Sequence, residues 1–147
     1  MTQTGKQARD VMTRDPKCVS EKDSITDVAR IMKSSDTGVV PVVEGKKIVG
    51  LITDRDIVVR GLADGKDLQK ASVSDLMTRE VRSVHEDSPI DEVLALMSSS
   101  EIRRVTVVNT KDELVGILSI GDISTGTNKD GQVGKAIENI SQAPPNH

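Results

Sequence analysis

The sequence predicts an α+β protein built from two β-α-β-β-α repeats that pack together as an intramolecular pseudo-twofold pair. Two observations predict this fold class: an internal duplication, and, in each copy, a helical apolar spacing followed by two short apolar runs. The chain has 147 residues and no Phe, Trp or Tyr, so its core must be aliphatic. Neither half would bury much core alone, and we therefore expect the halves to pack against each other.

The duplication is in register over most of the chain. Residues 10–43 align with residues 75–108 at an offset of 65, which places Met12 on Met77 and Thr13 on Thr78. One residue is then inserted, and at an offset of 66 the segment 50–57 (GLITDRDI) aligns with 116–123 (GILSIGDI). The repeated outline is Gly, two aliphatic residues, Thr or Ser, two variable residues and Asp.

Each repeat opens with a short extended segment, at 17–21 and 82–86, and continues with a predicted helix. Apolar residues at helical spacing mark both helices: Ile25, Val28, Ile31 and Met32 in the first, and Ile90, Val93, Leu96 and Met97 in the second.

The starts of these two helices carry capping signals. Ser24 is followed by Asp27 and Ser88 by Asp91, which predicts a hydroxyl cap at each start. Pro89 is predicted to occupy the first helical position, where its missing N–H costs nothing.

Two predicted hairpins follow the helices, one in each repeat. Apolar runs at 38–43 and 47–53, and at 104–108 and 114–119, are joined by polar turns. A further helix is expected to begin at 53–65, which completes the first repeat. The predicted organisation is repeat 1 at 8–62, a polar linker at 63–72, repeat 2 at 73–126, and a partly helical C-terminal extension at 127–147 with a frayed end.

Composition argues against several classes of function. The net charge of −3 provides no electrostatic footprint for nucleic acid, and no apolar run reaches the roughly 20 residues of a membrane helix. We therefore expect a protein that binds neither membrane nor nucleic acid. One cysteine, Cys18, permits no intrachain disulfide, which agrees with a reducing compartment, and we expect the protein to be cytoplasmic.

These features together resemble a tandem CBS-domain pair, also called a Bateman module. The resemblance covers residues 8–126 and rests on the two Met-Thr openings, the VVPVV strand around Pro41, and the doubled G-h-h-[TS]-x-x-D motif. The sequence is similar in particular to small stand-alone bacterial and archaeal proteins of this family.

The resemblance implies a regulatory binding module with an adenosine-containing ligand in the cleft between the repeats. AMP, ADP and ATP are the candidate ligands, and no obligatory cofactor is implied. The motif Asp would accept hydrogen bonds from the ribose hydroxyls, the Thr or Ser would reach the ribose or phosphate, and basic residues before the second strand would contact phosphate. Carried over, the ligand residues are Thr53, Asp56, Arg103, Arg104, Ser119 and Asp122. A homodimer and a regulated partner protein are also implied.

Other interpretations of the motif remain open at this point. [TS]-x-x-D is also a capping box, in which Thr53 with Asp56, or Ser119 with Asp122, only satisfies helix N–H groups. The alternative function is a ligand-free interaction module that dimerises through the apolar helix faces at 25–32 and 90–97.

An enzyme is not predicted. Asp54 and Asp56 have no third acid or His at a ligand-like spacing, and the two histidines, His85 and His147, form neither a metal site nor a catalytic triad.

Overall fold

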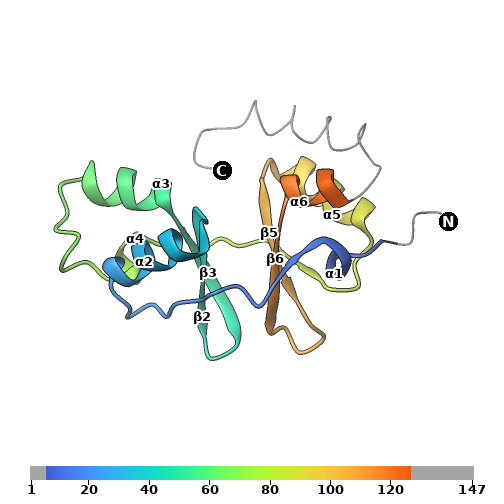
Figure 1. Cartoon of the computed structure of the whole chain (residues 1–147), viewed down its shortest axis with the longest axis horizontal. Helices are drawn as coiled ribbons and strands as arrows, with labels where there is room; N and C mark the ends of the chain where they lie inside the picture. Colours follow the sequence, from blue (N-terminus) through green and yellow to red (C-terminus); the bar gives the residue numbers. More distant parts are fainter. Residues whose placement is uncertain (1–5, 127–147) are drawn as a thin grey trace. The chain divides into compact units, whose positions relative to one another are not determined.

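The computed structural model describes residues 6–126 and confirms an α+β fold with two repeated units (Figure 1). Within the described residues, one compact unit comprises 16–81 and the other comprises 6–15 together with 82–126. We call them the first-repeat unit and the second-repeat unit. The predicted C-terminal extension at 127–147 and His147 lie outside the described residues.

The first-repeat unit is a two-stranded antiparallel sheet with helices beside it. Its strands are β2 (Val39–Glu44) and β3 (Lys47–Thr53), and its helices are α2 (Ile25–Ser35), α3 (Asp54–Asp56), η1 (Ile57–Leu62) and α4 (Val73–Leu76). Val19 adds a parallel bridge to Val42 at the edge of the sheet. The predicted extended segment, helix and hairpin are therefore all present.

The second-repeat unit is built on a four-stranded sheet in the order β1-β6-β5-β4. Its strands are β1 (Thr13–Arg14), β4 (Ser83–His85), β5 (Arg104–Val108) and β6 (Leu114–Ser119), and its helices are α1 (Ala8–Val11), α5 (Ile90–Ser100) and α6 (Ile120–Gly126). Only the β4–β5 pair is parallel among these strands.

The Met-Thr opening of each repeat packs on the other repeat's unit. Thr13 of β1 pairs with Ile117 of β6, and Thr78 forms an antiparallel bridge with Leu51 of β3. A Cβ on Gly50 would lie 2.6 Å from the carbonyl oxygen of Thr78, and a Cβ on Gly116 would lie 2.9 Å from that of Thr13. The glycine of the duplicated motif is therefore required because a neighbouring main chain crosses directly over it.

The two hydrophobic cores are entirely aliphatic, as the composition predicts. Val28, Val40 and Ile52 are fully buried in the first-repeat unit, and Met97 and Leu118 are fully buried in the second. The apolar faces of α2 and α5 thus supply the cores of their own units. The large apolar residues of the predicted dimer patches at 25–32 and 90–97 therefore lie in, or pack against, the cores of their own units.

The cap predicted at Ser24 is confirmed, and the one predicted at Ser88 is wrong. Ser24 Oγ accepts the main-chain N–H of Asp27 at 3.1 Å at the start of α2. In α5 the N-cap is Pro89 and the helix begins at Ile90, so the prediction of Pro89 at the first helical position is also wrong by one residue. Ser88 Oγ instead accepts the N–H of His85 at 3.1 Å. The offset of 65 aligns Ser24 with Pro89, so Asp91 lies one position too early to complete a capping box.

The helix after β3 changes type within a few residues. Asp54–Asp56 is α-helical, and Ile57–Leu62 continues as a π-helix, with the N–H of Ala63 donating to the carbonyl of Val58 at 2.8 Å. A π-helical segment is uncommon and often lies beside a functional site. Here it starts at the residue that follows the motif Asp.

Candidate functional site

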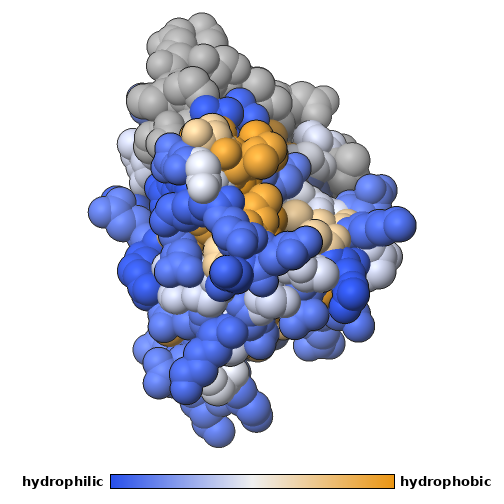
Figure 2. Space-filling model, turned by 90° about the vertical axis from the view of Figure 1, so that its left-hand side faces the viewer, coloured by the Kyte–Doolittle hydropathy of each residue, from blue (hydrophilic) through white to orange (hydrophobic). Residues whose placement is uncertain are grey.

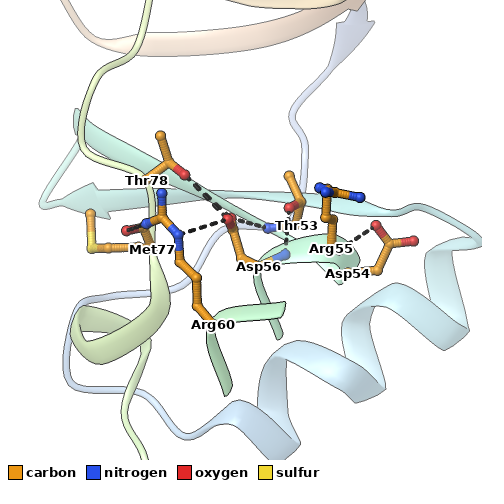
Figure 3. A network of polar contacts seen from close by, with 7 residues as sticks. All are labelled: Thr53, Asp54, Arg55, Asp56, Arg60, Met77 and Thr78. Carbon is orange, nitrogen blue, oxygen red and sulfur yellow. Dashed lines mark hydrogen bonds and ion pairs between the residues drawn. The ribbon is translucent and has the colours of Figure 1, made fainter. Parts of the chain in front are cut away.

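The first motif lies where β3 ends and α3 begins (Figure 3). Thr53 is the N-cap: its Oγ1 accepts the N–H of Asp56 at 3.0 Å, and Asp56 Oδ2 accepts the N–H of Thr53 at 2.9 Å. Asp56 is only 9 % exposed, which makes it the one buried charged residue in the described part of the chain. The reciprocal capping box holds a carboxylate at a fixed place beside the strand end.

The second motif repeats this geometry at the end of β6. Ser119 Oγ accepts the N–H of Asp122 at 3.1 Å, and Asp122 Oδ2 accepts the N–H of Ser119 at 2.9 Å. The structure therefore shows the capping role at both motifs. In both motifs the same carboxylate oxygen, Oδ2, accepts the hydrogen bond from the N-cap residue, so Asp56 and Asp122 have the same local orientation.

Two residues that the sequence did not single out complete the surroundings of Asp56. The Thr78 hydroxyl donates to Asp56 Oδ1 at 3.3 Å and lies 3.5 Å from Oδ2. Arg60 Nε lies 3.8 Å from Oδ1, and the Arg60 Nη1 donates to the carbonyl of Met77 at 3.1 Å. Figure 3 shows these side chains converging on the Asp56 carboxylate from η1 and from the Met-Thr segment.

The repeat alignment held a signal for Thr78 but none for Arg60. Thr78 is matched by Thr13 in the duplicated Met-Thr opening, and this recurrence is a signal from which it could have been found. Arg60 falls on Gly126 at the offset of 66, and a residue present in one repeat only leaves no trace in the comparison of the two repeats.

The predicted phosphate-contacting arginines lie next to the second motif. Arg104 pairs in register with Ser119 across β5 and β6, and the carbonyl of Arg103 accepts the N–H of Ile120 at 3.1 Å. Arg103 is exposed, and Arg104 is partly buried. The structure thus brings both arginines, Ser119 and Asp122 into one neighbourhood.

The corresponding place in the first motif carries an acid instead of a base. The carbonyl of Gly38 accepts the N–H of Asp54 at 3.0 Å, as that of Arg103 does for Ile120. A Cβ on Gly38 would lie 2.9 Å from Asp54 Oδ2, so the Asp54 carboxylate covers this glycine. The two motifs share their capping geometry but differ in the charges around them.

Over residues 6–126, no three His, Cys, Asp or Glu side chains are grouped as a metal site would require. His85 is an exposed residue of β4. The same residues include no helix with the length and hydrophobicity needed to cross a bilayer.

Comparison with known proteins gives the family. A model of the CBS domain matches residues 8–62 and, a second time, residues 73–126. The chain belongs to the CBS-domain family. An uncharacterized protein, YlbB of Bacillus subtilis, is 38 % identical over 136 residues, which cover 91 % of this chain and 90 % of that protein.

Two solved structures of CBS proteins are similar to this chain and differ in what they hold. The CBS domain pair of protein MJ0100, solved in complex with 5′-methylthioadenosine and S-adenosyl-L-methionine, has a TM-score of 0.72 and 33 % identity over 82 % of this chain and 98 % of that one. Hypoxic Response Protein I, solved with two coordinated zinc ions, has a TM-score of 0.74 and 33 % identity over 83 % of this chain and 99 % of that one.

Proposed function

We propose that this CBS protein is a regulatory sensor of an adenosine-containing nucleotide such as AMP, ADP or ATP. The observation that carries the proposal is the pair of carboxylates, Asp56 and Asp122, held by the same capping geometry at the ends of equivalent strands. The adenosine compounds bound by the similar MJ0100 pair support the ligand class. Repeats at 8–62 and 73–126 are the ligand-binding domains in this proposal, and the protein acts in the cytoplasm without catalysing a reaction.

The assigned roles follow from the chemistry of each group. A carboxylate fixed in direction can accept both hydroxyls of a ribose cis-diol in charge-assisted hydrogen bonds. The hydroxyls of Thr53 and Ser119 lie at the same strand ends and contact the ribose or phosphate. Arg103 and Arg104 supply positive charge for phosphate at the second motif.

Ligand binding regulates the protein only if it favours one of two states. In this proposal the nucleotide shifts such an equilibrium, and a partner protein reads the result.

Calorimetric titration with AMP, ADP and ATP tests the proposal. We expect Asp122→Ala and Asp56→Ala each to weaken binding at its own motif by about 10-fold or more, since a hydrogen bond to a charged group contributes about 1.5–3 kcal/mol. Asp27→Ala is the matched control, because Asp27 also lies three residues after a capping hydroxyl, on α2. Unchanged affinity in both motif variants, or an equal loss in Asp27→Ala, would refute the site.

A second candidate function is an interaction module that dimerises without a ligand. Figure 2 shows apolar side chains gathered on a mostly hydrophilic face. The exposed large apolar residues of the described chain all lie on η1: Val58 at 54 %, Val59 at 42 % and Leu62 at 64 % exposure.

We propose a second copy of this chain as the occupant of that surface, which replaces the helix faces that the sequence suggested. Light scattering on Leu62→Glu should then show a monomer where the unmodified chain shows a dimer. A dimer in the variant would rule this surface out.

A further inference from the structure

The two oxygens of the Asp56 carboxylate have different surroundings. Oδ2 accepts the N–H of Thr53 at 2.9 Å in the helix cap and lies 3.5 Å from the Thr78 hydroxyl. Oδ1 faces the Thr78 hydroxyl at 3.3 Å and Arg60 Nε at 3.8 Å. The direction of Oδ1 is therefore what a ligand hydroxyl at this motif would depend on.

The Arg60 guanidinium contacts two groups, one through a hydrogen bond and one as an ion pair. Nε lies beside Asp56, and Nη1 donates to the carbonyl of Met77 at 3.1 Å. Because a guanidinium is planar, contacts at two of its nitrogens set the orientation of the whole group. The residue after Met77 is Thr78, whose main-chain N–H and carbonyl both form hydrogen bonds with Leu51. The Met77 carbonyl therefore lies in a segment that is attached to β3.

The exposure of this pair favours a role in geometry over a role in stability. The Arg60 side chain is 46 % exposed, whereas that of Asp56 is 12 % exposed and largely buried. With one partner nearly half in solvent and the charged atoms 3.8 Å apart, the pair adds less to the stability of the fold than a fully buried, hydrogen-bonded pair would. The guanidinium lies beside one oxygen of a carboxylate whose other oxygen accepts a hydrogen bond in the helix cap.

We propose that Arg60 is a positioning residue of the first motif, which aims Asp56 Oδ1 at the cis-diol of the ligand's ribose. This inference rests on the proposed function, because it concerns the same ligand at the same carboxylate. Gly126 stands at the matching place in the second repeat, so this device belongs to the first motif alone. The first motif then discriminates ribose from 2′-deoxyribose through an acceptor that Arg60 holds in place.

The experiment compares the affinities of AMP and 2′-deoxy-AMP by calorimetry in an Asp122→Ala background, which leaves only the first motif intact. We expect AMP to bind about 10-fold or more tightly than 2′-deoxy-AMP, because the deoxy ligand leaves a charged acceptor short of one hydrogen bond. Adding Arg60→Met should reduce this ratio several-fold. Arg60→Lys, which keeps the charge but cannot reach both partners with a fixed fork, should give an intermediate ratio.

Arg55→Met is the matched control, since it removes a positive charge from the same helix. The main-chain N–H of Arg55 donates to Asp54 Oδ1 at 2.8 Å, and Figure 3 shows its side chain directed away from the Arg60 guanidinium. The ratio in this control should equal that of the Asp122→Ala protein.

Two results would overturn the inference, and they are distinguishable. An Arg60→Met protein that binds both ligands more weakly but keeps the ratio shows that Arg60 contributes only to stability or general charge. If the Asp122→Ala protein and the unmodified protein both fail to bind AMP, the proposed function falls, and the inference falls with it.

Discussion

Replacing Gly50 with Ala tests whether the Met-Thr segment docks on the duplicated motif. The new Cβ would lie 2.3 Å from Met77 Cε and 2.6 Å from the Thr78 carbonyl oxygen. The end of a Met side chain can move, but a main-chain carbonyl cannot move without its segment. Either the segment stays and is overpacked, or it shifts and loses its bonds to Leu51.

Both outcomes lower the free energy of unfolding by a similar amount. The two Leu51–Thr78 main-chain bonds, at 2.9 and 2.8 Å, are at risk, and a net contribution of about 1 kcal/mol each gives a loss of about 2 kcal/mol. Overpacking costs about 1–3 kcal/mol. For a chain of this size we expect the thermal midpoint to fall by about 4–8 °C.

Circular dichroism is the suitable assay, because the chain has no Trp or Tyr to report unfolding by fluorescence. Gly121→Ala is the control: its nearest contact would be Ser119 Oγ at an ordinary 3.6 Å, and it lies within α6. Its midpoint should stay or rise, since Ala favours a helix over Gly. A loss of even about 1 kcal/mol would lower the midpoint by a few degrees. A Gly50→Ala midpoint within about 1 °C of that of the unmodified protein would therefore refute the docking geometry.

Three further predictions concern other parts of the described chain. The N–H of Ser72 donates to the Asp75 carboxylate and lowers its pKa below 3.8; its contribution to stability is present above that pH and is lost as the pH falls through the folded value. The stability difference between the unmodified protein and Asp75→Asn should therefore shrink in acid, and a constant difference in melts across pH would contradict this. Burial raises the pKa of Cys18, so the folded protein should react with iodoacetamide more slowly than the urea-unfolded chain near pH 8.5, and equal rates would show that the thiol is not shielded. Met97→Ala should cost about 2–5 kcal/mol in urea unfolding, because Met97 is fully buried, and a loss below about 1 kcal/mol would mean that the site collapses freely.

The fold could be predicted from the sequence because the duplication repeats the apolar spacing of the helices and the paired apolar runs of the hairpins. The aliphatic periodicity of 25–32 and 90–97 and the hairpin runs are confirmed by α2, α5 and the strands. The exchange of the Met-Thr openings could not be predicted, since identical openings fit either repeat equally well. The Ser-x-x-Asp spacing predicts a cap at Ser88, but the repeat register places Pro89 at the N-cap of α5, and that is what the structure shows.

The candidate site was predicted from the repeated motif, together with Arg103 and Arg104, which the family resemblance implies. Thr53 with Asp56, and Ser119 with Asp122, form the capping pairs that the motif indicates. Arg60 could not be found, because its contact with Asp56 and Met77 depends on how η1 winds and on which opening segment lies beside it. Neither feature leaves a pattern in the linear sequence.

Equilibrium dialysis against AMP, read at 260 nm, tests the central claim most directly. With no Trp, Tyr or Phe, the protein contributes little near-ultraviolet absorbance of its own, so bound adenine can be measured directly in the protein compartment. We predict saturable binding in the unmodified protein and its loss when Asp56→Ala and Asp122→Ala are combined. Absence of saturable binding at millimolar AMP, ADP and ATP, or full binding by the double variant, would contradict the account.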